Sequence, residues 1–320
     1  MIETAALSKL YGEFPALQDL TLAIRKGEVF GLLGPNGSGK TTTIRLILGM
    51  LKPSSGRASV SGFDCWEDSV RVRELVSYLP GELRLYGAMT GLATLRFLSD
   101  LRGGAGLDRA VAIAEKVMKL DLRRQVRTYS TGMKQKLALA QTFSDPVEIL
   151  ILDEPTSALD PSARHDVIGL VADARANGQT VIFSGHVLHE VEQVSDRVGI
   201  MRHGRLMHVE DMHERRSLRM LLIRFGGGQV PPFPDELDLR IRQVNGDVHL
   251  LEHRGSLSEL LAWLAFQDVA ELAIGTEDLR SLYDQYHGAA GEEDEAAREE
   301  RLAAEAEERA ALTMADRADA

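Results

Sequence analysis

The sequence is poor in cysteine and in uninterrupted apolar stretches, and it has no excess of positive charge. The single cysteine, Cys65, excludes an intramolecular disulfide and a metal site built from several cysteines, and it fits a reducing compartment. The 37 basic residues face 48 acidic ones, which leaves a net charge of −11. We therefore expect no nucleic-acid partner, because a non-specific nucleic-acid binder needs an electropositive face.

Long hydrophobic runs are also missing. No stretch reaches the roughly 18–20 apolar residues that a membrane-spanning helix needs, and the best candidate, 257–274, is broken by Glu259, Gln267, Asp268 and Glu271. The first residues lack the basic start and apolar run of a secretory signal. These features predict a cytoplasmic protein that relies on a partner for any membrane span.

Residues 1–214 have the pattern of an α/β domain, in which short apolar runs alternate with glycine-rich turns and helical segments. The runs 29–33, 149–152 and 180–183 predict buried parallel strands. Residues 65–145 lie between the first two strands and are mostly helical in pattern. They predict an inserted helical subdomain.

Residues 215–287 predict a second, smaller α+β domain, in which Trp263 is a core residue. Asn245-Gly246 between apolar flanks predicts a tight hairpin, and Ser256 to Glu259 form a capping box that opens a helix through Phe266. The remaining elements expected here are strands at 220–225 and 269–274 and a helix over 276–286.

Residues 288–320 consist almost entirely of Ala, Glu and Arg. They hold eleven acidic residues and four arginines, and so contribute most of the negative charge. This composition predicts a mobile, solubilising tail; a specific interaction tail is the alternative.

The first chemical motif follows the 29–33 strand and matches the phosphate-binding loop G-x-x-x-x-G-K-[ST]. Its backbone N–H groups and the positive end of the next helix can surround a phosphate. Lys40 is expected to reach the β- and γ-phosphates, and Thr41 to bind Mg²⁺. The predicted nucleotide-binding residues of this segment are Gly34, Pro35, Asn36, Gly37, Ser38, Gly39, Lys40, Thr41 and Thr42.

The second motif is the apolar run 149–152 followed by two carboxylates, Asp153 and Glu154. Asp153 is predicted to bind Mg²⁺, directly or through water. Glu154 is placed to polarise an attacking water. An apolar strand ending in Asp-Glu is a weak signal alone, but it becomes a strong one beside a phosphate-binding loop.

Between and after these motifs lie segments that resemble ABC-type ATPases. Residues 129–136, Tyr-Ser-Thr-Gly-Met-Lys-Gln-Lys, resemble the family's signature sequence. Residues 157–160 resemble its D-loop, 184–186 its switch-histidine loop, and Tyr11, ahead of the first strand, the aromatic residue that stacks on adenine. The elements occur in the family's order across residues 1–214.

The resemblance implies a P-loop ATPase fold of ABC type, with a mixed β-sheet core. It also implies that Ser130 and Gly132 contact the γ-phosphate, that Asp160 belongs to the nucleotide site, and that His186 reaches the γ-phosphate. With Lys40 and Glu154, His186 completes the expected catalytic set.

Three positions depart from the family's pattern. Thr131 replaces the first signature glycine, and Met133 replaces the usual glutamine. In the segment that resembles the Q-loop, Gly81 stands where most members have a glutamine that touches Mg²⁺. The neighbouring Glu82 is a hard oxygen ligand that could replace it; the alternative is that water alone completes the metal shell.

The function that the resemblance implies is Mg²⁺-dependent ATP hydrolysis that drives a separate integral-membrane permease. The signature form is similar to that of efflux ATPases, and so is the extension 215–287. The implied assembly is a head-to-tail homodimer, or a pseudo-dimer with a related subunit, that encloses two ATP molecules. It would sit peripherally on the cytoplasmic face of the cell membrane.

Other uses of the same core stay open. A non-transport ABC-type ATPase, regulatory or associated with DNA or ribosomes, is disfavoured because the chain has no long coiled-coil insertion and no second tandem core. Intact Glu154 argues for real hydrolysis. An importer subunit is the nearer alternative, although importers often carry a longer β-rich regulatory domain.

Overall fold

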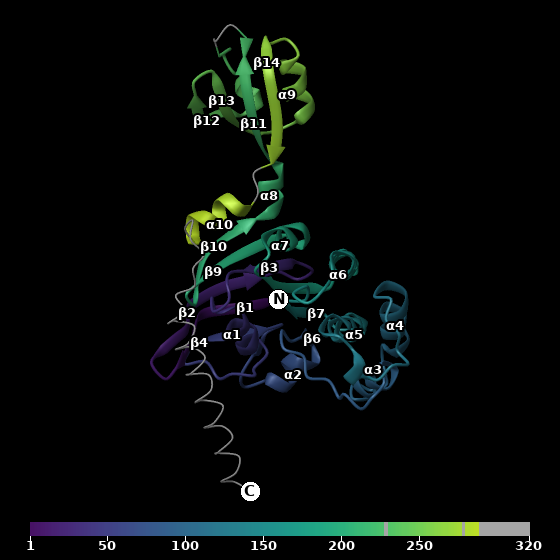
Figure 1. Cartoon of the computed structure of the whole chain (residues 1–320). Coiled ribbons are helices and arrows are strands. Elements are labelled where there is room, and N and C mark those ends of the chain that lie inside the picture. The colour runs from purple at the N-terminus through teal and green to yellow at the C-terminus, as the bar shows by residue number, and fades with distance from the viewer. Residues whose placement is uncertain (227–229, 277–278, 288–320) are drawn as a thin grey trace. The chain divides into compact units, whose positions relative to one another are not determined.

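The computed structural model describes residues 1–226, 230–276 and 279–287. The chain divides into two compact units (Figure 1). Among the described residues, the larger unit comprises Met1–Val209 with residues 286–287, and the smaller one comprises Glu210–Gln285. The acidic tail predicted at 288–320 lies outside the described residues. In the described part of the chain, no helix combines the length and apolar character needed to cross a bilayer.

The larger unit begins with an antiparallel sheet of four strands. Alternating residues of the first strands are buried, because one face of this sheet covers the core. The strand order is β2 (Phe14–Ile24), β1 (Ile2–Tyr11), β4 (Ser55–Val60) and β5 (Phe63–Asp64).

A six-stranded sheet forms the centre of this unit, and its β9-β3-β8-β7-β6 pairs are parallel. β3 and β7 are buried at every residue, as expected for parallel strands covered on both faces. The predicted strands at 29–33, 149–152 and 180–183 are confirmed. In order, the strands are β10 (Arg205–Asp211), β9 (Arg197–Arg202), β3 (Val29–Leu33), β8 (Thr180–Gly185), β7 (Ile149–Asp153) and β6 (Val76–Leu79).

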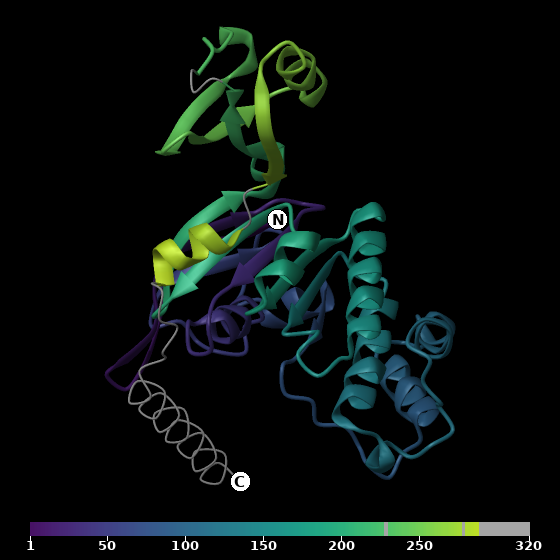
Figure 2. The ribbon, with the colours of Figure 1, turned by 45° about the horizontal axis from the view of Figure 1, so that its top comes forward.

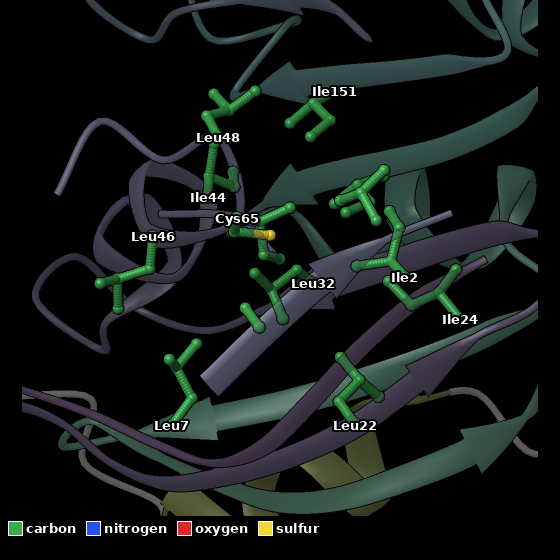
Figure 3. Packing of buried hydrophobic residues seen from close by; sticks show 14 of the residues in the cluster. Ile2, Leu7, Leu22, Ile24, Leu32, Ile44, Leu46, Leu48, Cys65 and Ile151 are labelled. Atoms are coloured by element: carbon green, nitrogen blue, oxygen red, sulfur yellow. The ribbon is translucent and has the colours of Figure 1, made fainter. Parts of the chain in front are cut away.

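The main core lies between the two sheets and around α1 (Lys40–Ile47) (Figure 3). Ile2 and Ile24 reach it from the antiparallel sheet, and Ile151 reaches it from the parallel one. Cys65 is buried in this cluster, and burial raises the pKa of its thiol to about 12. The thiol is therefore protonated at neutral pH and contributes to packing.

The predicted helical insertion at 65–145 is not helical throughout, because Val76–Leu79 forms β6 at the edge of the central sheet. The run Val-Ser-Tyr-Leu before Pro80 is a weak strand signal by itself, and it forms a strand by pairing with Ile149–Leu152. Beyond it, the blue helices α3 and α4 pack against α5 (Figure 2). The helical elements of this region are α2 (Ser69–Glu74), α3 (Gly91–Asp100), α4 (Leu107–Ala112), η1 (Ile113–Val117), η2 (Val126–Thr128) and α5 (Thr131–Ser144).

Two further helices connect strands of the central sheet. α6 (Pro161–Ala176) connects β7 to β8, and α7 (Leu188–Val194) connects β8 to β9. The α6 crossover joins the parallel neighbours β7 and β8, which a short turn cannot connect, and the α7 crossover passes β3, which lies between β8 and β9. They place the loops after β7 and β8 at the same edge of the sheet.

The smaller unit is an antiparallel sheet with α9 (Leu257–Leu264) packed on it. The hairpin near Asn245-Gly246 is present, with Gly246 at φ +63°. Ser256 precedes α9 as its N-cap, but its side chain makes no capping hydrogen bond, so the predicted capping box is wrong in that detail. Trp263 packs against the core with its ring edge-on to Phe233.

The strands of this unit run in the order β12 (Leu239–Asn245), β13 (Val248–Arg254), β11 (Leu218–Phe225) and β14 (Val269–Thr276). The other elements here are α8 (Met212–Ser217), η4 (Asp235–Leu237) and the greater part of α10 (Leu279–His287), whose residues from 286 belong to the larger unit.

Candidate functional site

The loop between β3 and α1 has the backbone of a phosphate cradle. Gly37 and Gly39 adopt φ values of +83° and +102°, which side-chain-bearing residues rarely do. A Cβ at Gly34 would lie 2.5 Å from both the Met201 carbonyl oxygen and the Ser38 Oγ. These glycines let the chain turn sharply into α1, which begins at Lys40.

Lys40 lies across this loop and is 4% exposed. Its Nζ donates to the carbonyl oxygens of Gly34 at 2.7 Å and Pro35 at 3.1 Å. It also lies 3.6 Å from Oε1 of Glu154. The ammonium group is thus held inside the curve of the phosphate loop, where a cation can form hydrogen bonds to phosphate oxygens.

Asp153 ends β7 as a buried carboxylate, 1% exposed. Its Oδ2 accepts from the Thr41 Oγ1 at 3.0 Å and its Oδ1 from the Ser184 Oγ at 2.6 Å. Burial raises the pKa of Asp153, and the two hydroxyl hydrogen bonds oppose that effect. Two of the three predicted metal-binding residues, Thr41 and Asp153, are therefore in contact.

Glu154 follows in a left-handed backbone conformation, with φ at +48°. Such a conformation is uncommon for a residue with a side chain, and it persists only where neighbouring groups hold it. Its N–H donates to the Ser184 Oγ at 3.1 Å, and its Oε2 lies 3.4 Å from Nδ1 of His186. Lys40, Glu154 and His186 consequently meet at one point.

The sequence motifs did not identify Ser184 as a site residue, although its hydroxyl contacts both the Asp153 carboxylate and the Glu154 N–H. It pairs with Asp153 across the parallel β7–β8 register and is fully buried. Sequence alone shows a serine two residues before a histidine. Only the order of strands in the sheet shows that its hydroxyl faces Asp153.

The segment resembling the family signature begins α5. Ser130 is the N-cap, and its Oγ accepts from the Met133 N–H at 3.2 Å. A Cβ at Gly132 would lie 2.7 Å from the Ala158 carbonyl oxygen, so this glycine allows close contact with the D-loop segment. The signature and D-loop segments therefore form one surface.

Asp160 caps the next helix, α6. Its Oδ1 accepts from the Ala163 N–H at 2.9 Å, and its Oδ2 lies 3.3 Å from Lys136 Nζ. The backbone hydrogen bond, followed by the one from Lys136, lowers the pKa of Asp160. Within the described residues, no hydrogen bond or ion pair joins Ser130, Gly132 or Asp160 to the phosphate loop.

Tyr11 is the last residue of β1, not a residue ahead of the first strand. Its ring is 5% exposed, and Lys9 Nζ lies 5.1 Å from the ring centroid. Tyr11 pairs with Phe14 at the end of the β1–β2 hairpin. The same hairpin approaches the phosphate loop, because a Cβ at Gly39 would lie 2.9 Å from the Ala16 carbonyl oxygen.

The segment after β6 brings Gly81, rather than a side chain, to the Asp153 carboxylate. A Cβ at Gly81 would lie 3.6 Å from Oδ2 of Asp153. Glu82 is the next residue and is exposed. Among the residues that the structure covers, no cluster of three or more His, Cys, Asp or Glu side chains is arranged to hold a metal ion.

Comparison with known proteins identifies the family. The family model described as ABC transporter matches residues 17–157. The linearmycin resistance ATP-binding protein LnrL of Bacillus subtilis is 32% identical over 213 residues, which cover 65% of this chain and 68% of LnrL. The bacitracin transport ATP-binding protein BcrA of Enterococcus faecalis is 33% identical, covering 67% of this chain and 73% of BcrA. The chain belongs to the ATP-binding proteins of ABC transporters.

A solved structure supports the fold independently. The ATP-binding cassette MJ0796, a dimer bound to ADP and Pi, matches with a TM-score of 0.61 and 22% identity, over 66% of this chain and 99% of that chain. The predicted fold class, an α/β P-loop ATPase of ABC type, is confirmed.

Proposed function

We propose that the chain hydrolyses Mg²⁺-ATP and that hydrolysis drives export through a separate integral-membrane permease. The observation that carries the ATPase proposal is the meeting of Lys40, Glu154 and His186 beside the Thr41–Asp153 contact. The export proposal is supported by relatives named for linearmycin resistance and bacitracin transport. The chain would then act at the cytoplasmic face of the membrane.

Each residue of this cluster has a distinct task in the proposal. The loop N–H groups and Lys40 bind the β- and γ-phosphates, after Lys40 exchanges its carbonyl partners for phosphate oxygens. The Glu154 carboxylate takes a proton from the water that attacks the γ-phosphorus, and the bond to the ADP oxygen breaks. His186 holds the γ-phosphate in line with that water.

The residues present fit a magnesium ion. Thr41 and Asp153 supply hard oxygen atoms, and Mg²⁺ is usually bound by one or two protein groups together with nucleotide phosphates. When bound, the ion would neutralise charge on the phosphates. A cation would also offset the cost of keeping the Asp153 carboxylate charged at 1% exposure. Glu82 is the further candidate ligand from the Q-loop segment.

We further propose that two chains associate head to tail. Ser130, Gly132 and Asp160 make no hydrogen bond or ion pair to the phosphate loop among the described residues, yet the family resemblance assigns them to the nucleotide site. A second chain could supply them from the opposite side. Tyr11 would stack on adenine after its ring becomes more exposed than the 5% seen here.

The decisive experiment compares wild-type chain with Glu154→Gln and a matched control, Glu148→Gln. A carboxylate oxygen of Glu148 lies 3.5 Å from Lys26 Nζ, and one of Glu154 lies 3.6 Å from Lys40 Nζ, so the two ion pairs are similar. Glu148 precedes β7, however, whereas Glu154 follows it. Phosphate release should fall at least about a hundredfold in Glu154→Gln and stay unchanged in Glu148→Gln. Normal turnover in Glu154→Gln would refute the assigned base.

The dimer and the permease need separate measurements. Light scattering with Mg²⁺-ATP should show a doubled mass for Glu154→Gln, because the amide keeps the shape and slows hydrolysis. Co-purification of the chain with an integral-membrane protein, and stimulation of its hydrolysis by that protein, would support the transport role. A chain whose turnover no membrane protein alters would contradict it.

A further inference from the structure

An ion pair between a buried glutamate and a partly exposed arginine lies next to the candidate catalytic residues. Glu190 on α7 is 6% exposed, and its Oε1 accepts from NH1 of Arg164 on α6 at 3.1 Å. The other carboxylate oxygen accepts a hydrogen bond from the Thr156 hydroxyl. Both oxygens of this carboxylate are therefore occupied by groups from two different segments.

Arg164 connects the pair to the D-loop segment. Its Nε donates to the Leu159 carbonyl oxygen at 3.0 Å while its NH1 holds Glu190. A guanidinium group can bridge two acceptors in this way because its donors lie in one rigid plane. The result is a chain of contacts from Leu159 through Arg164 and Glu190 to Thr156.

These contacts enclose the segment that carries Glu154. Thr156 lies two residues after Glu154, and Glu190 lies four residues after His186. Ser184 holds the N–H of Glu154 from one side, and Glu190 holds Thr156 on the other. The left-handed conformation of Glu154, with φ at +48°, is thus secured at both ends.

A small cavity confirms that the pair is next to the site. Its volume is about 40 Å³, which is room for a water molecule or two. Glu154 and His186 line it together with Thr156, Arg164 and Glu190. A shift of the ion pair would therefore move the walls of the space beside the proposed base.

We propose that Glu190 and Arg164 are positioning residues for hydrolysis, which keep the loop of Glu154 and the loop of His186 in one fixed relation. The pair contacts neither the phosphate loop nor Lys40 in the described structure. It should therefore affect turnover and leave nucleotide affinity intact. This inference rests on the proposed ATPase function.

The test compares Glu190→Gln with Glu28→Gln in the full chain. Glu28 is also 6% exposed, and its carboxylate also has two partners, Arg197 NH1 at 3.2 Å and the Arg25 N–H at 2.6 Å. It precedes β3, at the end of the sheet opposite the site. Both variants lose a buried charge, so both should show a similar fall in melting temperature.

We expect kcat of Glu190→Gln to fall about tenfold, the usual size of an effect on residues that orient catalytic groups. Its Kd for a fluorescent ATP analogue should stay within about twofold of wild type, since the loop contacts are untouched. Glu28→Gln should keep both kcat and Kd. Arg164→Lys is a milder variant that retains the charge but lacks the rigid planar fork that holds Leu159 and Glu190 together, so it should also lose turnover.

Two results would overturn the inference. One is a kcat of Glu190→Gln and Arg164→Lys equal to that of Glu28→Gln; the other is a loss of ATP affinity that accounts for the whole effect. A different result would refute the proposed function itself: wild-type protein that hydrolyses no ATP, or whose hydrolysis does not depend on Glu154. The positioning role would then be refuted with it.

Discussion

Ser184 offers the most direct test of how the site is held together. Its hydroxyl donates to Asp153 at 2.6 Å and accepts from the Glu154 N–H at 3.1 Å, and the residue is fully buried. Ser184→Ala removes one small atom from a strand and leaves the backbone ladder of β8 in place. It nevertheless leaves a buried carboxylate and a partly buried N–H without this partner.

The expected cost follows from these two losses. A hydrogen bond to a charged group contributes about 1.5–3 kcal/mol, and a buried group left without a partner costs about 1–3 kcal/mol. Both losses occur at one site and do not add fully. We therefore expect the free energy of unfolding to fall by about 3 kcal/mol, which lowers the melting temperature by roughly 6–12 °C. The pKa of Asp153 should rise further, since the Ser184 hydrogen bond lowers it.

Ser99→Ala is the matched control. Ser99 is 1% exposed, but its hydroxyl makes a single hydrogen bond, to the Ala105 carbonyl oxygen at 2.9 Å, and it lies in α3. For Ser99→Ala we expect the free energy of unfolding to fall by only about 1 kcal/mol. Differential scanning calorimetry and phosphate release would be measured on both variants. Equal melting temperatures, or normal turnover in Ser184→Ala, would refute the reasoning.

Three further predictions concern the same site. Lys40→Ala should weaken binding of a fluorescent ATP analogue by about tenfold to a hundredfold, because a charge-assisted hydrogen bond is lost; wild-type affinity would exclude the phosphate-loop assignment. Asp153→Asn should melt at a higher temperature than nucleotide-free wild type at neutral pH. Burial raises the Asp153 pKa above its ordinary 3.8, so the stability of the protonated form is present below that value and is lost as pH rises through the folded pKa. The advantage should vanish near pH 4, and a constant difference across the titration would contradict it. Glu82→Ala should raise the Mg²⁺ concentration needed for half-maximal hydrolysis if Glu82 supplies an oxygen; an unchanged titration would leave Gly81 and water at that position.

Much of the larger unit could be predicted because its signals are local. The strands at 29–33 and 149–152 are short, apolar and bounded by turns, and parallel strands covered on both faces require that pattern. The phosphate loop is equally local, since the φ values of Gly37 and Gly39 depend on having no side chain. The start of α1 at Lys40 follows from the same turn.

Other features depended on partners far away in the sequence. Val76–Leu79 became a strand because β7 pairs with it, although the helical pattern around it favoured a helical insertion. Ser256 has the right type and spacing for a capping box, yet its side chain makes no capping bond. A local sequence pattern shows which hydrogen bonds and pairings are possible, and tertiary packing determines which of them form.

The sequence was sufficient for the chemical inventory of the site: a phosphate loop, a strand with two carboxylates, and a histidine after another strand. It could not show that Ser184 would join Asp153 and Glu154, or that Glu190 and Arg164 would enclose the segment behind them. Those contacts bridge 26 to 31 residues of chain. They exist only because β7 and β8 are neighbours in the parallel sheet, and strand order is set by long-range burial that no short segment of sequence encodes.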